Sequence, residues 1–367
     1  MPEGSAKESC EELTIAVEGA AAIVTLDRPQ SGNALSGAIR SRIAESIPRF
    51  ARDPGVYALI MRSGTQGAFS VGSDLRELGS AAKEQPERAR QLLADTYRLS
   101  WILECFSKPT ISLIDGLIMG SAAGLTAYGT HRVAGETFSF ALPQTGFGFF
   151  ADAGLSWVCA RMPDEIGVYL GLTGRRIGRA DAYRLGLVTH CIPASRFSEI
   201  EAGLRSADPV DPLLDDRHEE PGPGEIESYR EVLQRCFAAE TVEEICSRLR
   251  AEAQRGGAAG GWCEDVLQDL SRRSPTALKI TLRHIREAAF RDLRQTLMID
   301  CRLACRLVGS HDFREGVRVL LANQDRPRWI PEHLSEVSEA TVDRIFAFQP
   351  GRELILPTRQ EMQAARF

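Results

Sequence analysis

The first half of the chain alternates short apolar runs with segments of helical periodicity. The strand-like runs are Leu13–Val17, Ala21–Leu26, Val56–Arg62 and Pro109–Gly116. Glu18-Gly19 lies between the first two runs and predicts a β-hairpin, whereas a long helix is predicted over Glu84–Phe106, before the last run. Strands joined by a helical crossover pair in parallel, so this half is restricted to an α/β layered core with parallel strands.

The pattern changes after about residue 205. Residues 206–226 are rich in Pro, Gly and acidic side chains, which is typical of a linker or exposed loop. Six helices are predicted beyond it: Tyr229–Phe237, Thr241–Ala253, Trp262–Ser271, Pro275–Ala288, Leu293–Val308 and Phe313–Leu321. The Gly-rich Arg255–Gly261 is expected to break the helices. The predicted organisation is a core over 1–205, a linker over 206–226 and a helical region over 227–367.

Composition excludes several classes of function. The formal net charge is −6 and no basic stripe dominates any segment, which argues against a nucleic-acid partner. No apolar run reaches 18 residues, so no membrane span is expected. The polar, acidic start predicts neither a secretory signal nor a mitochondrial presequence, and we expect a cytoplasmic protein. Nine cysteines without CxxC spacing and six separated histidines predict reduced thiols and no metal site.

Two strand-to-helix turns carry small residues that suit a ligand. In GAFSVGSDLREL, Gly72-Ser73-Asp74 ends a strand-like segment before a helix, where outward N–H groups favour an anion or a developing oxyanion. The alternative is that Asp74 only caps the helix. In DGLIMGSAAGL, Gly120 and Ser121 allow close backbone approach at a similar transition, or they only serve tight packing. Two N–H groups from separate loops could converge on one carbonyl oxygen.

A third stretch, FALPQTGFGFFADAG, places Gln144 and Asp152 among apolar residues and glycines. A buried carboxylate without a partner costs several kcal/mol, so Asp152 needs a partner, water or a catalytic role. The alternative is an N-cap for a helix over Ala153–Arg161. Other nucleophile or base candidates have no recognisable motif around them: Ser156, Cys159, Cys191 and His190.

Together these segments resemble the crotonase (enoyl-CoA hydratase/isomerase) superfamily. The similarity runs from VTLDRPQSGNAL through GAFSVGSDL and KPTISLIDGLIMGSAAGL to GLTGRRIGRADAYRLGLVTHCI. FALPQTGFGFFADAG is similar to the FAMPETxIGxFPDxG block of the 3-hydroxyisobutyryl-CoA hydrolases of valine degradation. The segments CFAAETVEEI, SPTALKITLRHI and HDFREGVRVLLANQDRPRWIP also match that subfamily, so the resemblance covers roughly Leu13 to Phe346.

The resemblance implies a β-β-α spiral core with an all-helical C-terminal region that binds an acyl-CoA thioester. Coenzyme A is then part of the substrate, and no metal or organic cofactor is implied. A homo-oligomer through the C-terminal helices stays open, since the extra helices of this subfamily could cover the same surface within one chain.

The resemblance implies an oxyanion hole and a set of residues that contact the substrate. The backbone N–H groups of Ser73 and Ser121 would form the oxyanion hole, with Ser where the family usually has Gly. The residues expected to contact substrate are Arg28, Gly72, Asp74, Gly120 and Thr96, with Arg28 at the CoA entrance, where a cation suits phosphates. Arg326 and Arg328 are weaker candidates for the same task.

The family's hydrolases carry Glu at the position of Gln144 and Asp at that of Asp152. Gln cannot take a proton at neutral pH or attack as a carboxylate, but it can hold a water molecule by hydrogen bonding. We therefore expect Asp152 to act as general base and Gln144 to orient water or substrate. An additional acid of the family falls at Thr96, and the two glutamates of the hydratases fall at Gly124 and Gln144. Three interpretations stay open: an acyl-CoA thioester hydrolase, an enoyl-CoA hydratase or isomerase, and an inactive acyl-CoA-binding protein.

Overall fold

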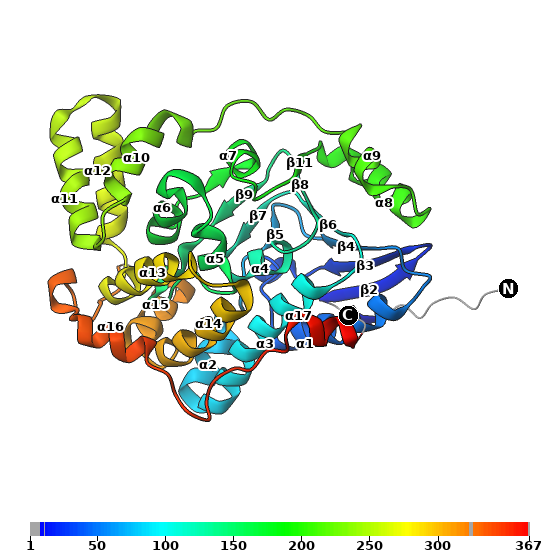
Figure 1. Cartoon of the computed structure of the whole chain (residues 1–367), viewed down its shortest axis with the longest axis horizontal. Coiled ribbons are helices and arrows are strands. Elements are labelled where there is room, and N and C mark those ends of the chain that lie inside the picture. Colours follow the sequence, from blue (N-terminus) through cyan, green and yellow to red (C-terminus); the bar gives the residue numbers. More distant parts are fainter. Residues whose placement is uncertain (1–7, 11, 323–325, 366–367) are drawn as a thin grey trace.

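A seven-stranded sheet forms the centre of the molecule (Figure 1). The computed structural model describes residues 8–10, 12–322 and 326–365. The strands of this sheet are β1 (Glu8–Cys10), β2 (Leu13–Glu18), β3 (Ala21–Leu26), β4 (Ala58–Ser63), β6 (Thr110–Ile114), β8 (His131–Ala134) and β11 (His190–Cys191), and they pair in that order. The hairpin β2–β3 is antiparallel, and every pair from β3 to β11 is parallel. The predicted hairpin and parallel core are both confirmed.

A second sheet of four short strands carries the turns that the sequence singled out. Its strands, in spatial order, are β10 (Ile177–Gly178), β9 (Ser139–Ala141), β7 (Leu117–Met119) and β5 (Ala68–Ser70). The parallel pairing of β5 with β7 brings the chain just after both strands to one edge of the sheet. Ser73 and Ser121 follow these strands, so the topology places the two turns beside each other.

Helices surround both sheets. Those of the first half are α1 (Gly37–Arg52), α2 (Leu75–Glu84), α3 (Pro86–Cys105), α4 (Ala123–Thr126), α5 (Leu155–Cys159), α6 (Ile166–Thr173), α7 (Arg179–Arg184), α8 (Phe197–Arg205) and α9 (Val210–Asp215). Those of the second half are α10 (Arg230–Phe237), α11 (Val242–Arg255), α12 (Gly257–Ser271), α13 (Pro275–Ala288), α14 (Leu293–Leu307), α15 (His311–Ala322), α16 (Glu339–Phe346) and α17 (Arg359–Ala364). None of the helices in the described part of the chain has the length and apolarity needed to cross a bilayer.

Helix starts follow the capping signals of the sequence. The Ser274 side chain accepts the N–H of Ala277, and Pro275 occupies the first helical position of α13, which needs no donor there. Thr241 caps α11 in the same way by accepting the N–H of Glu244. The predicted helix over Pro275–Ala288 is observed with the same bounds.

In the second half, one expectation needs correction and the predicted helix break is confirmed at a single residue. The segment 206–226 contains helix α9, which buries Leu213 and Leu214 against the sheet side of the core, so apolar anchoring replaces a free linker there. The Gly-rich Arg255–Gly261 breaks the helices at one residue, Gly256, at a φ of 73°. The following glycines are the first turns of α12, whose packed face begins at Gly260 and Trp262.

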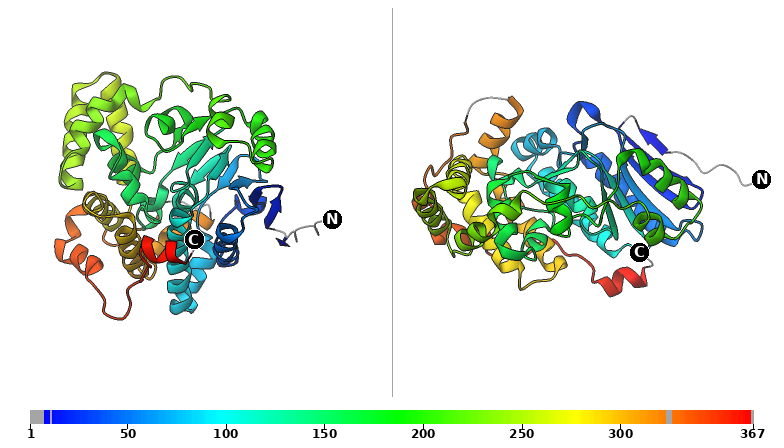
Figure 2. Two further views of the ribbon diagram at one scale, coloured as in Figure 1. Left: turned by 45° about the vertical axis from the view of Figure 1, so that its right-hand side comes forward. Right: turned by 90° about the horizontal axis from the view of Figure 1, so that it is seen from above.

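The helical region shares its core with the first half of the chain. One hydrophobic cluster joins residues of α3, such as Leu92 and Tyr97, with Leu297 and Leu303 of α14. In all three views α11 and α12 lie at the opposite end of the molecule from the amino-terminal strands, whereas α14 runs beside α3 (Figures 1 and 2). Helix α15 contacts the one-turn helix η3 (Pro143–Phe147). C-terminal helices therefore form one wall of the space above the second sheet.

Candidate active site

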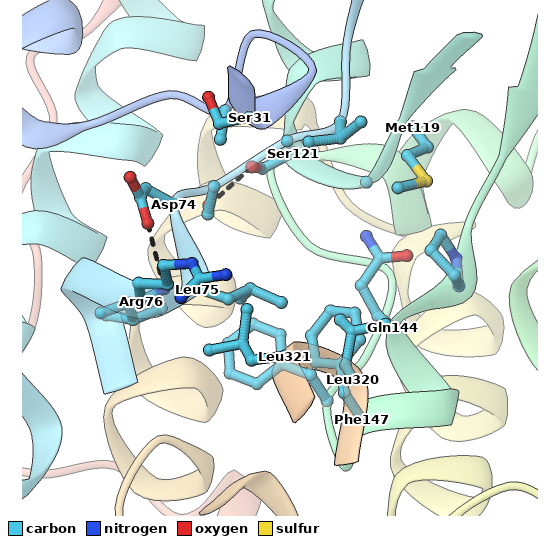
Figure 3. Close-up of a pocket in the computed structure, with 18 of the residues that line it drawn as sticks. Ser31, Asp74, Leu75, Arg76, Met119, Ser121, Gln144, Phe147, Leu320 and Leu321 are labelled. Atoms are coloured by element: carbon cyan, nitrogen blue, oxygen red, sulfur yellow. Dashed lines mark hydrogen bonds between the residues drawn. The ribbon is translucent and has the colours of Figure 1, made fainter. Parts of the chain in front are cut away.

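A cavity of about 910 Å³ lies where the two sheet-edge turns face η3 and α15 (Figure 3). Its polar lining includes Gly72, Ser73, Gly120, Ser121, Gln144 and Asp152. Phe147, Leu320 and Leu321 form an apolar wall on the side away from Ser121 (Figure 3). The structure thus brings the three stretches singled out in the sequence into one pocket, and adds α15 to them.

The N–H groups of Ser73 and Ser121 are available to a ligand for local reasons. Leu35 donates its N–H to Gly72 O at 2.8 Å and accepts the N–H of Asp74 at 3.0 Å. In a parallel bridge of this kind, the N–H of the intervening Ser73 points away from Leu35. Ser121 is the second residue of the one-turn helix η2 (Gly120–Ala122), and such a position has no intrahelical acceptor for its N–H.

Gly72 allows the two turns to approach closely. It adopts a φ of 95°, which L side chains rarely do, and a Cβ there would lie 3.0 Å from Met119 O and 3.4 Å from Ser121 N. The glycine therefore satisfies both a backbone and a packing requirement. This close approach brings the backbones of the two turns together in the lining of the cavity.

Asp152 lines the same cavity and is buried, with 4% of its surface exposed. The hydroxyl of Tyr97 donates to Oδ2 at 3.0 Å, and Nε2 of Gln144 donates to Oδ1 at 3.3 Å. The N-cap interpretation is wrong: α5 begins at Leu155 after Gly154, because the chain enters it through left-handed Ala153 and Gly154. Asp152 is thus held by side chains and faces the cavity.

Burial is the main cause that raises the pKa of Asp152 to about 7, and the charge of Asp300 adds to it. Hydrogen bonds from Gln144 and Tyr97 and the charge of Arg40 act in the opposite direction. Asp300 is itself fully buried, where it accepts from His284 Nε2 at 2.5 Å and from Gly154 N at 2.7 Å. A carboxyl with a pKa near neutrality can exchange a proton at working pH.

Gln144 is 2% exposed, and its Oε1 is buried without a hydrogen-bond partner among the described residues. Unsatisfied buried acceptors are rare and call for water or a ligand. Because this side chain lines the cavity, the unpaired oxygen can accept a hydrogen bond from a bound hydroxyl or water molecule.

Asp74 caps α2, as the sequence suggested, and also pairs with Arg28. Its Oδ1 accepts the N–H groups of Arg76 and Glu77 and caps α2, while Oδ2 accepts from Arg28 Nη1 at 2.6 Å. Arg28 also donates to Glu12 at 2.8 Å, so two carboxylates share its charge. Arg76 and Arg176 line the same cavity and are exposed, and the described part of the chain offers neither of them an ion pair. Among the described residues, these two cations therefore lack the carboxylate partners that share the charge of Arg28.

Several residues lie outside the cavity lining. Thr96 is buried on α3, where its hydroxyl donates to Leu92 O at 2.9 Å and is occupied within its own helix. Arg326 and Arg328 are not among the lining residues, and the backbone of Arg328 is bound to Glu315 and His311. His190 lies on the edge strand β11 and pairs with Asp215. The described residues contain no group of three His, Cys, Asp or Glu side chains suited to a metal ion.

Sequence reasoning missed Arg40, Tyr97 and Asp300. Arg40 is 4% exposed although it is charged. It precedes Ile43 and Ile47 by three and seven residues, so it shares their buried face of α1, and this spacing was the available signal. Tyr97 and Asp300 contact the Asp152 region only through the tertiary fold, and no local pattern marks them.

The comparisons with known proteins agree with this geometry. The family model described as enoyl-CoA hydratase/isomerase matches residues 21–346. The chain is 34% identical to 3-hydroxyisobutyryl-CoA hydrolase 1 of Arabidopsis thaliana, covering 93% of each, and 31% identical to the mitochondrial 3-hydroxyisobutyryl-CoA hydrolase of Rattus norvegicus, covering 94% of this chain and 90% of that one. Among solved structures, a carnitinyl-CoA dehydratase from Mycobacterium thermoresistibile superposes with a TM-score of 0.87 at 32% identity, covering 94% of this chain and 99% of that one. The chain belongs to the enoyl-CoA hydratase/isomerase family and has the crotonase fold.

Proposed function

We propose that this protein hydrolyses an acyl-CoA thioester of the 3-hydroxyisobutyryl-CoA type. The observation that carries the proposal is one cavity lined both by the turns of Ser73 and Ser121 and by the buried carboxyl of Asp152. Thioester hydrolysis needs donors for the oxyanion and a base for water, and the lining of this cavity offers both. The names of the curated relatives support the same reaction.

In the proposed reaction, the thioester oxygen accepts the N–H groups of Ser73 and Ser121. Ionised Asp152 takes a proton from water as the water oxygen attacks the carbonyl carbon, and the oxyanion forms between the two N–H donors. The C–S bond then breaks, and the CoA thiolate receives the proton from Asp152. Removing one such oxyanion donor typically costs about 100- to 1000-fold in rate.

Gln144 replaces a carboxylate at the position where the family's hydrolases have Glu. Its Nε2 donates to Asp152, and its Oε1 is the unpaired acceptor in the cavity. The amide can therefore hold the attacking water between its own oxygen and the Asp152 carboxylate. This assigns orientation to Gln144 and proton transfer to Asp152.

Hydration of an enoyl-CoA is the second candidate. It is favoured by the likeness to the dehydratase above and to an enoyl-CoA hydratase from Rhodobacter sphaeroides, at a TM-score of 0.87 and 29% identity over 94% of this chain and all of that one. The pKa of about 7 also allows Asp152 to donate a proton, which addition to a double bond requires.

The test is thiol release from 3-hydroxyisobutyryl-CoA by the parent protein, Asp152→Asn and Gln144→Glu. We expect turnover by the parent and none by Asp152→Asn. Turnover seen only in Gln144→Glu would refute the one-carboxylate mechanism and indicate that the natural chain has lost this chemistry. Loss of enoyl absorbance with crotonyl-CoA, without thiol release, would identify the hydratase instead. Saturable binding without either reaction would identify an acyl-CoA-binding protein.

A further inference from the structure

A buried arginine lies directly behind the two turns of the cavity. Arg40 Nη1 donates to Leu35 O at 2.7 Å, and Nη2 donates to Ser73 Oγ at 2.7 Å. Among the described residues no carboxylate oxygen lies within ion-pair distance of this guanidinium. Burial lowers the pKa of Arg40 to about 10, against the charges of Asp152 and Glu77, so the group stays protonated at neutral pH. A buried cation without an ion pair is costly, so its presence here calls for an explanation.

The hydrogen bonds continue from Arg40 toward the cavity. Ser73 Oγ and Ser121 Oγ lie 2.7 Å apart, and both residues line the pocket. Ser121 is labelled in Figure 3. Guanidinium can only donate, so the Ser73 oxygen must accept from Arg40. The two hydroxyls hold two hydrogens, and the bond between them uses one. No other acceptor in the described part of the chain takes the second hydrogen.

The second O–H is therefore available to a bound ligand. We propose that the Ser73–Ser121 hydroxyl pair, polarised by Arg40, donates one O–H to the acyl oxygen as a third hydrogen bond besides the two backbone N–H groups. Ser121 is 7% exposed and borders Gly72, where an added Cβ would lie 3.4 Å from its N and 3.6 Å from its Oγ. Its N and Oγ thus border the same small volume beside Gly72.

The inference rests on the proposed acyl-CoA site but not on the reaction performed there. A cation joined to the acyl oxygen through three hydrogen bonds strengthens the donor as negative charge develops, because the interior screens charge less than water does. Ser121 would touch substrate, whereas Arg40 is a positioning residue that acts through Ser73. The side chains that replace glycine in this family's turns then add a donor and do more than fill space.

Carbonyl polarisation tests the proposal without turnover. The probe is the ketone analogue of isobutyryl-CoA in which a methylene replaces the thioester sulfur, with a 13C-labelled carbonyl. We expect the bound carbonyl stretch to fall below its value in water for the parent protein. The fall should be smaller in Ser121→Ala, in Ser73→Ala and in Arg40→Met, with partial recovery in Arg40→Lys. Arg40, Ser73 and Ser121 form one chain of hydrogen bonds, so the double variant Ser73→Ala/Ser121→Ala should change the carbonyl stretch little more than either single variant does.

The matched control is Ser112→Ala, a buried serine on β6 that does not line the cavity and whose hydroxyl has no partner among the described residues. It should leave the carbonyl stretch at the parent value. An unchanged stretch in Ser121→Ala and Ser73→Ala would overturn the proposal, as would a parent that does not bind the analogue. If Arg40→Met fails to fold, the serine variants decide the outcome.

Turnover separates this inference from the proposed function. For a hydrolysed substrate, Ser121→Ala should lower kcat by about 100-fold, with KM little changed, because the donor acts most strongly in the transition state. A polarised carbonyl without thiol release would overturn the proposed hydrolysis and leave the third donor supported. Thiol release by the parent, together with a carbonyl stretch that the serine changes leave unaltered, would support the proposed hydrolysis and overturn the third donor.

Discussion

Replacing Asp152 by Asn should stabilise the folded protein at neutral and alkaline pH while it abolishes thiol release. Burial raises the pKa of this carboxyl from its ordinary 3.8 to about 7. A tenfold change in proton affinity corresponds to about 1.4 kcal/mol. Ionised Asp152 therefore destabilises the folded state by about 4 kcal/mol relative to the unfolded chain, which is an upper limit. Asn carries no charge and avoids this cost.

The dependence on pH has a definite sign. A raised pKa means that the folded state binds the proton more tightly, so the cost is absent below pH 3.8, grows up to pH 7 and is complete above it. The difference in unfolding free energy between Asp152→Asn and the parent should therefore increase by about 3 kcal/mol from pH 5 to pH 8.

The surrounding hydrogen bonds can adapt to Asn. The Asn oxygen can accept from Tyr97 as Asp152 Oδ2 does, and the Asn amide can donate to Gln144 if that side chain turns its unpaired Oε1 toward it. After that turn Nε2 of Gln144 replaces Oε1 as the unpaired group in the cavity, where a water molecule can bind it, so the number of unpaired Gln144 atoms stays the same.

The assay is denaturant unfolding at pH 5 and pH 8 for the parent and Asp152→Asn. Asp216→Asn serves as the matched control because Asp216 is exposed on the segment after α9. A stability difference that stays constant or shrinks as the pH rises would refute the conclusion that an ionised, buried Asp152 is the costly species.

The remaining predictions concern the same cavity. Tyr97→Phe removes a hydrogen bond that lowers the pKa of Asp152, so the acid limb of the kcat/KM profile should move to higher pH. Asp300→Asn removes a charge that raises the pKa of Asp152, so the acid limb should move to lower pH. A shift in the same direction in both variants would contradict the roles given to Tyr97 and Asp300. Asp300→Asn should also lower the melting temperature, because it breaks a buried pair whose loss costs about 3–5 kcal/mol. Gly72→Ala should lower kcat at least tenfold, since the added Cβ would lie 3.0 Å from a carbonyl oxygen of the facing turn at a φ of 95°; near-normal kcat would show that the turns need no close approach. Arg28→Met should raise KM less than twofold, about 0.4 kcal/mol, because two carboxylates already hold this cation; a large rise in KM would show that Arg28 binds the phosphates.

Local signals account for most of what could be predicted. β3 and α13 were predicted with their observed bounds because a hydrophobic run and a Ser-Pro start depend on neighbours in the sequence. The region around Gly256 was predicted less well, since whether glycines continue as a helix depends on the core that Trp262 enters. The prediction of a linker or exposed loop over the acid- and proline-rich segment 206–226 missed helix α9 for the same reason, because the burial of Leu213 depends on the sheet beside it.

The candidate site divides in the same way. The residues that carry the family motifs, Ser73, Ser121, Gln144 and Asp152, were identified from short segments, since a turn between a strand and a helix has a local signature. The placement of Thr96 could not be predicted, because a helix shows which residues share a face but not what that face meets. The shared charge of Arg28 likewise requires Glu12 and Asp74 to meet in space.

The sequence by itself therefore determined the α/β core, the helical C-terminal region and the motifs that mark the cavity. Only the tertiary structure decided the raised pKa of Asp152 and the contact between the two serine hydroxyls. Tyr97 lies 55 residues away along the chain from Asp152, and Arg40 lies 33 residues from Ser73. Charge and desolvation act through space, so the chemistry of a buried carboxyl depends on side chains that its neighbours in sequence do not reveal.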